Sequence, residues 1–158
     1  METIVGDEVE VPNRAAMDAL FRADGWAAHA GVTLDDWGGG WARVTYVPRA
    51  DHRNFGGVVH GGAVFSAGDV AFAVASNSWG RSAVALSIDT HFLAAPAVGA
   101  PLTVVATERN RTRRTASYDI VGTAPDGAAV ATWHAMVYRL DRWHLGEDAW
   151  PDDWRARH

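Results

Sequence analysis

The feature that most constrains this 158-residue chain is the segment HGGAVFSAGDVAFAVASN, residues 60 to 77. From Gly61 to about Trp79, apolar and small residues occupy every side of a helical wheel, which predicts a helix buried in the middle of the fold. Asp69 is the one carboxylate within this segment. An ionised carboxylate in apolar surroundings is costly unless partners compensate it, so Asp69 is a candidate for chemistry.

A second, shorter helix is expected at residues 13–24. Met17, Leu20 and Phe21 recur there at helical spacing, with Asn13 as a possible N-cap and Gly25 as a stop.

The remaining chain favours strands separated by turn residues. Two strands are expected at 31–37 and 40–48, a loop at 49–59, and four further strands at 83–94, 101–109, 114–123 and 128–139. This order predicts an α+β fold in which an antiparallel β-sheet wraps around the central helix. A single sheet covers only part of a helix that is apolar all round, so we expect a second copy of the chain to cover the rest.

Length, charge and cysteine content exclude several classes of protein. The chain fits one domain, at residues 1–140, with a Trp-rich extension at 141–158. The formal charge of −5 gives no general attraction to nucleic acid or anionic lipid, and the absence of cysteine excludes disulfides and thiolate metal sites. The apolar run at 61–76 is interrupted by Asp69 and glycines, so no membrane span is expected. Without a basic, apolar leader, a cytoplasmic location is expected.

A set of polar and glycine positions at fixed spacing resembles a known family. The pattern NxxxxxHGGxxFxxxDxxFA begins at Asn54, and LSxDxxFL begins at Leu86. These residues are similar to those of the hotdog-fold acyl-CoA thioesterases, and within them to the PaaI-type (phenylacetate-degradation) group. The resemblance implies a hydrolase that cleaves acyl-CoA to a free acid and coenzyme A, with an aryl or arylacetyl acyl group favoured.

The resemblance also implies roles for individual residues. Gly61, at the start of the central helix, corresponds to the backbone N–H donor for the oxyanion, and Asn54 to the residue that holds the carbonyl or the attacking water. Asp69 corresponds to the nucleophile or general base, and Ser87 to a hydroxyl that positions water or the carboxylate. His60 and Gly62 are assigned to substrate binding beside Gly61.

The distance between Gly61 and Asp69 along a helix indicates that one chain alone does not complete this site. Asp69 follows Gly61 by eight residues, or about 12 Å at a helical rise of about 1.5 Å per residue. We therefore expect a shared site, with Asn54 and Gly61 from one chain and Asp69 and Ser87 from its partner.

Each assignment has a structural alternative. Asp69 is also placed to pair with Arg43 or Arg81, Asn54 to form a turn, and His60 to tie the loop to the helix start. The three Trp side chains of the extension are compatible with docking on the sheet, shielding an acyl pocket or a subunit contact.

Four arginines lie close together at residues 108–116, in a chain that is acidic overall: Arg109, Arg111, Arg113 and Arg114. Arg111, Arg113 and Arg114 are assigned as a clamp for the phosphates of coenzyme A, because guanidinium groups match phosphate oxygens. A solvated hairpin tip is the alternative, and on alternating strand positions only some of these side chains share a face.

No metal or redox cofactor is expected, and coenzyme A enters only as part of the substrate. The spacing of His52, His60 and His91 matches no metal-ligand motif. The expected partners are the acyl-CoA substrate and further copies of the chain, as a dimer or a dimer of dimers. Two other functions compete: a hydratase of the same fold, whose spacing fits less well, and a non-catalytic acyl-CoA binding or sensor module.

Overall fold

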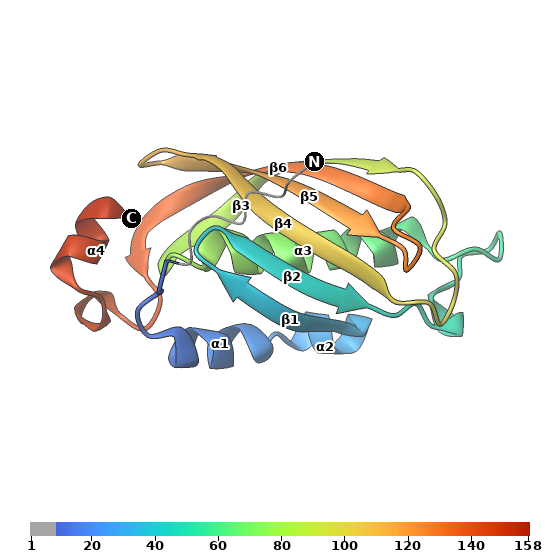
Figure 1. Cartoon of the computed structure of the whole chain (residues 1–158), viewed down its shortest axis with the longest axis horizontal. Coiled ribbons are helices and arrows are strands. Elements are labelled where there is room, and N and C mark those ends of the chain that lie inside the picture. Colours follow the sequence, from blue (N-terminus) through green and yellow to red (C-terminus); the bar gives the residue numbers. More distant parts are fainter. Residues whose placement is uncertain (1–8) are drawn as a thin grey trace.

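The computed structural model describes residues 9–158, so the first eight residues, on which the expectation about a leader depends, lie outside the described part. Six antiparallel strands form one sheet in the order β1-β2-β4-β5-β6-β3, and the long helix α3 packs against it (Figure 1). The strands are β1 (Val32–Gly38), β2 (Trp41–Tyr46), β3 (Arg81–Phe92), β4 (Leu102–Arg111), β5 (Thr115–Thr123) and β6 (Ala129–Trp143). The predicted α+β fold, an antiparallel sheet around a central helix, is confirmed.

Helix α3 (Gly61–Asn77) begins at the predicted residue and ends two residues before the predicted end. Gly68 lets it approach the sheet closely, because a Cβ atom at that position would lie 2.4 Å from the Trp133 ring. Phe72 packs edge-on against Tyr118 of β5, with ring centroids 5.5 Å apart. No helix within residues 9–158 is long and apolar enough to span a membrane.

One stripe of α3 stays uncovered by the sheet. Gly62, Phe65, Asp69 and Ala73 follow one another at intervals of three or four residues and are exposed or only partly buried, whereas most of the other positions of α3 are buried. The neighbouring edge strand β3 exposes large apolar side chains, namely Val84 (47%), Leu86 (57%) and Phe92 (54%). A single protomer therefore leaves side chains of α3 around Asp69 and apolar side chains of β3 uncovered, as expected from a helix that is apolar all round.

Two helices replace the single one expected at residues 13–24. Helix α1 spans Arg14–Arg22, and α2 spans Gly25–Ala30. Gly25 begins α2 and is no stop, because the side chain of Asp24 accepts the N–H groups of Trp26 and Ala27 at 2.8 and 3.0 Å.

Asn13 precedes α1, but the prediction that its side chain caps the helix is wrong. Its backbone has a φ of 58°, and its side chain makes no capping hydrogen bond. The side-chain amide instead donates to the carbonyl of Ala149 at 2.7 Å, which ties α1 to the C-terminal segment.

The C-terminal segment closes the end of the fold near the C-terminus of α3 (Figure 1). Strand β6 continues to Trp143, and a 3-10 turn (η2, Glu147–Ala149) and a helix (α4, Asp152–Arg157) follow. Trp154 is 4% exposed, and its indole N–H donates to the carbonyl of Trp79 at 3.0 Å. Trp150 is also buried. Two of the three Trp side chains of the extension are thus buried within the protomer. Trp154 docks at Trp79, which lies two residues beyond the end of α3.

Candidate active site

The first turn of α3 leaves one backbone donor free. His60 is the N-cap residue, and its Nδ1 accepts the N–H of Gly62 at 2.8 Å. The main-chain oxygen of His60 accepts the N–H groups of Ala63 and Val64 at 3.0 and 3.3 Å. Among residues 9–158, no acceptor reaches the N–H of Gly61. An unpaired N–H at the positive end of a helix dipole is a suitable donor to a developing oxyanion.

Asn54 lies in the loop that leads to α3 and has a structural role there. Its Oδ1 accepts the N–H of Gly56 at 2.8 Å, and its main chain bonds to Gly57 and Val58. The turn expected as an alternative for Asn54 is therefore present. Its side-chain NH₂ has no acceptor within residues 9–158, so the same side chain still has donors for a carbonyl or a water.

Asp69 lies partly buried on the uncovered stripe of α3. It has no hydrogen bond or ion pair within residues 9–158, and Arg81 pairs with Asp141 instead. Burial raises the pKa of the Asp69 carboxyl above its usual value, and the negative charge of Asp24 raises it further. A poorly solvated carboxylate with a raised pKa is a stronger base than an exposed one.

The protomer does not bring the four assigned catalytic residues together. Gly61 and Asp69 are about 12 Å apart along α3 at the standard rise. Ser87 is exposed on the edge strand β3, next to an irregularity between Ala85 and Ser87, and it pairs with Met136 of β6. It makes no hydrogen bond with Asp69.

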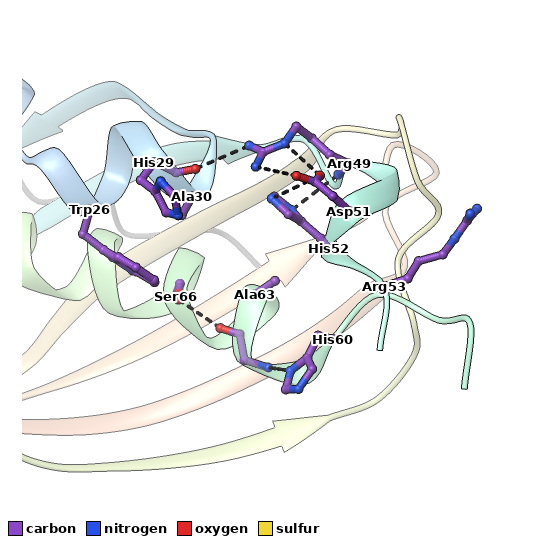
Figure 2. A pocket seen from close by; sticks show the side chains of 11 residues that line it. Trp26, His29, Ala30, Arg49, Asp51, His52, Arg53, His60, Ala63 and Ser66 are labelled. Atoms are coloured by element: carbon purple, nitrogen blue, oxygen red, sulfur yellow. Dashed lines mark hydrogen bonds and ion pairs between the residues drawn. The ribbon is translucent and has the colours of Figure 1, made fainter. Parts of the chain in front are cut away.

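A pocket of about 520 Å³ lies beside the first turns of α3 (Figure 2). His60, Gly62, Ala63 and Ser66 line its α3 side. Helix α2 and the turn η1 (Ala50–His52) supply the rest of the wall, with Trp26, His29, Ala30, Arg49, Asp51, His52 and Arg53.

Sequence reasoning did not place Trp26 and Ser66 at this pocket. Trp26 is 58% exposed on α2, a helix that the sequence pattern does not predict because Gly25 reads as a stop. Asp24 followed by a short alanine-rich segment was the signal that could have found it. Ser66, whose hydroxyl donates to the carbonyl of Gly62 at 2.9 Å, gave no signal in sequence.

The arginines near the β4–β5 turn divide into two groups. Arg111 and Arg113 line a second pocket near the C-terminal end of α3, and the Arg111 guanidinium lies 4.1 Å from the centre of the Trp79 ring. Arg114 instead donates to the hydroxyl of Tyr138, and Arg109 pairs with Asp119 at 2.5 Å. Only two of the three arginines assigned to the phosphate clamp therefore share a surface.

Histidines do not gather in the described part of the chain. Within residues 9–158 no group of three or more His, Asp or Glu side chains is arranged to hold a metal ion. His52 bonds to the hydroxyl of Tyr46 at 2.7 Å, and His60 caps α3.

Comparison with known proteins agrees with this fold. The model of the thioesterase superfamily matches residues 56–131. The acyl-coenzyme A thioesterase PaaI of Escherichia coli is 33% identical over 129 residues, which cover 82% of this chain and 92% of that protein. A putative esterase of Archaeoglobus fulgidus is 35% identical over 102 residues, 65% of this chain and 66% of the relative.

Solved structures give the same result. The structure of the E. coli PaaI protein superposes with a TM-score of 0.75 at 32% identity, covering 78% of this chain and 89% of that one. A variant of the phenylacetic acid degradation protein PaaI from Thermus thermophilus superposes with a TM-score of 0.71 at 36% identity. The match covers 74% of this chain and 100% of that one. The chain belongs to the thioesterase superfamily with the hotdog fold. Within that superfamily, it belongs to the PaaI-type group.

Proposed function

We propose that this chain hydrolyses acyl-CoA thioesters to a free carboxylic acid and coenzyme A. The observation that carries the proposal is two groups on α3 that have no partner within residues 9–158: the N–H of Gly61 and the carboxylate of Asp69. Kinship with a relative named as an acyl-coenzyme A thioesterase supports the choice of substrate.

The site is shared between two copies of the chain. A second α3, packed antiparallel on the stripe that contains Phe65 and Asp69, would bring its own Asp69 beside the Gly61 of the first copy. Asn54 and Gly61 then come from one copy, and Asp69 and Ser87 from the other. The exposed apolar side chains of the edge strand β3 support the same contact, since a second copy would cover them.

The reaction needs only groups that these residues supply. The Gly61 N–H polarises the thioester carbonyl and holds the oxyanion that forms on it, while the Asn54 side chain orients the carbonyl or the water. Asp69 either takes the proton from an attacking water or attacks the carbonyl carbon itself, giving an anhydride that water then cleaves. In both routes the C–S bond breaks, and the coenzyme A thiolate leaves and takes up a proton.

The acyl group proposed is an aryl or arylacetyl group. The supporting feature is the pocket beside Gly62 and Ser66, to which Trp26 contributes an exposed aromatic ring. A role in phenylacetate degradation, a cytoplasmic location and assembly as a dimer or a dimer of dimers complete the proposal.

Thiol release from a panel of acyl-CoA thioesters that includes phenylacetyl-CoA tests the function. We expect turnover by the unmodified chain and a loss of at least about 100-fold with Asp69→Asn, while coenzyme A still binds. Tight binding of thioesters without turnover by the unmodified chain would instead identify a non-catalytic sensor.

Mixing two inactive variants tests the sharing. A mixed dimer of Asp69→Ala and Asn54→Ala chains has one site with both defects and one intact site. If the copies reassemble at random, about a quarter of the normal activity returns. Activity that stays at zero in a verified mixed dimer shows that each copy holds its own site.

A further inference from the structure

The pocket near the C-terminal end of α3 has a wall dominated by arginine. Its volume is about 430 Å³. Strand β3, the end of β4 with the turn that follows, β6 and α4 together supply its six guanidinium groups, from Arg81, Arg111, Arg113, Arg139, Arg155 and Arg157. Thr112, Ala156 and His158 complete the wall, and among residues 9–158 no Asp or Glu side chain lines it.

Carboxylates that pair with these arginines lie outside the pocket wall. Arg81 pairs with Asp141, Arg155 with Glu147 and Asp152, and Arg157 with Asp153, and these carboxylates are 61% to 94% exposed. The Arg157–Asp153 pair is exposed on both sides and contributes only about 0–1 kcal/mol, because water screens it.

Two further arginines of the wall differ in their partners. Arg111 pairs at 3.2 Å with Glu108, whose side chain is 16% exposed. Arg113 has no carboxylate partner within residues 9–158. Within residues 9–158, five carboxylates thus pair with arginines of the six-guanidinium wall, which leaves an excess of one positive charge.

Arg139 adds a buried positive charge to this wall. It is 5% exposed, and its guanidinium donates to main-chain oxygens, that of Thr112 at 2.6 Å and that of His158. Burial, together with the charges of Arg111 and Arg81, lowers the pKa of Arg139 to about 10. A buried cation among like charges is unfavourable, and an anion that enters the pocket would offset that cost.

We propose that this arginine pocket binds phosphoryl groups. Guanidinium forks donate two parallel hydrogen bonds to phosphate oxygens, and several forks converging on one cavity suit a diphosphate or a phosphate monoester. If the proposed function holds, the phosphates of coenzyme A are the source, and a free pyrophosphate-type ligand is the other source of the same chemistry.

The arginine pocket lies at a position where the phosphate end of a substrate bound in the shared site could reach it. Asn77, the last residue of α3, is about 12 Å beyond Asp69 and about 24 Å beyond Gly61 along the helix. The Arg111 guanidinium covers Trp79, two residues further on. With two α3 helices antiparallel, the copy that supplies Asp69 therefore also supplies the nearer arginine pocket.

Half of the pocket comes from a part of the chain that the superfamily model does not match. That match ends at residue 131, before Arg139, Arg155 and Arg157. Strand β6 and helix α4 thus complete the proposed phosphate site, which the matched part of the chain supplies only in part.

Calorimetric titration of the unmodified chain with coenzyme A, pantetheine and pyrophosphate tests the proposal. The test variant is Arg113→Ala with Arg157→Ala, two exposed side chains whose loss leaves the core intact. Arg109→Ala is the control, because Arg109 lies near the end of β4, before the turn that contains Arg113, but pairs with Asp119 and does not line the pocket.

We expect the double variant to bind coenzyme A at least about 10-fold more weakly than the unmodified chain, and to bind pantetheine with unchanged affinity. The control variant should bind coenzyme A as the unmodified chain does. Arginine-dependent binding of pyrophosphate that coenzyme A does not displace identifies a free phosphate ligand and also supports the pocket. The proposal falls if the double variant binds coenzyme A and pyrophosphate as the unmodified chain does, or if pyrophosphate fails to bind and coenzyme A is indifferent to the arginines.

Thiol release separates this result from the proposed function. Arginine-dependent phosphate binding without thiol release leaves the pocket standing and refutes the hydrolase. The opposite result is normal thiol release by the double variant with an unchanged KM, together with no binding of pyrophosphate. That result supports the hydrolase and refutes the phosphate pocket.

Discussion

The Nδ1 atom of His60 accepts the N–H of Gly62 at 2.8 Å, and this bond leaves the N–H of Gly61 as the free donor at the start of α3. A helix N-terminus has several orphan donors, and here the cap residue and its main-chain oxygen satisfy those that follow Gly61. The capping side chain therefore decides which N–H at the start of α3 stays free, and under the proposed function this N–H is the donor to the substrate carbonyl.

Gly61→Ala is expected to separate activity from stability. A Cβ atom at Gly61 would contact the Phe92 ring at 3.4 Å, an ordinary van der Waals distance, so the fold should tolerate it. Alanine is also the better helix former, by up to about 1 kcal/mol. The added methyl group stands beside the free N–H and should displace the carbonyl, lowering kcat/KM about 100-fold in the thiol-release assay.

Gly25→Ala is the matched control, because Gly25 is the first residue of another helix and a Cβ there would meet nothing within 4 Å. Full activity of Gly61→Ala would remove Gly61 from the site.

The acid limb of the pH profile should report Asp69. Under the proposed function Asp69 acts in its ionised form, and burial raises its pKa, so kcat/KM should fall on acidification at a pH above 3.8, the ordinary value for aspartate. Asp24→Asn removes a neighbouring negative charge, which favours ionised Asp69, so the limb should move to lower pH. Asparagine keeps an oxygen to cap α2.

Asp152→Asn, an exposed change in α4, should leave the limb in place. A limb that does not move with Asp24→Asn would show that the two carboxylates do not interact.

Glu108 should be a major source of stability at the end of α3. Its Oε2 accepts the indole N–H of Trp79 at 2.9 Å and the hydroxyl of Tyr118 at 2.8 Å, and its Oε1 pairs with Arg111. Glu108→Ala leaves these donors without an acceptor and should lower the free energy of unfolding in urea by about 3–5 kcal/mol. Glu108→Gln keeps an acceptor oxygen and should lose less, about 1–2 kcal/mol.

Glu147→Ala, which breaks only an exposed pair with Arg155, should change stability by less than about 1 kcal/mol. Equal losses for Glu108→Ala and Glu147→Ala would contradict the network.

Trp154 should fasten α4 to the rest of the protein. Trp154→Ala removes a buried indole and should lower the free energy of unfolding by about 3–5 kcal/mol. Trp154→Phe keeps a ring but loses the hydrogen bond to the carbonyl of Trp79, for which about 1 kcal/mol is expected. Urea unfolding measures both, and a loss below about 1 kcal/mol for the alanine variant would mean that α4 packs only loosely.

Local pattern was enough to predict most elements. The helix that begins at Gly61 and the six strands appear where periodicity and turn residues place them, because both signals depend on near neighbours in sequence. The pattern predicts that a helix stops at Gly25, whereas Gly25 begins α2, because the side chain of Asp24 caps that helix. Strand β6 runs past its predicted end because Trp143 pairs with Arg81, a partner far away in the chain.

By itself the sequence determined that α3 is apolar on every side, that Asp69 and Gly61 lie on it eight residues apart, and that the chain has the residues of a PaaI-type thioesterase. Only the tertiary structure decided which stripe of α3 the sheet leaves open, that His60 takes the N–H of Gly62, and that Arg111 and Arg113 face a pocket while Arg114 does not. Periodicity defines the faces of a helix or strand. Which neighbours cover a face, and which donor finds which acceptor, depends on segments distant in sequence that meet only in the folded chain.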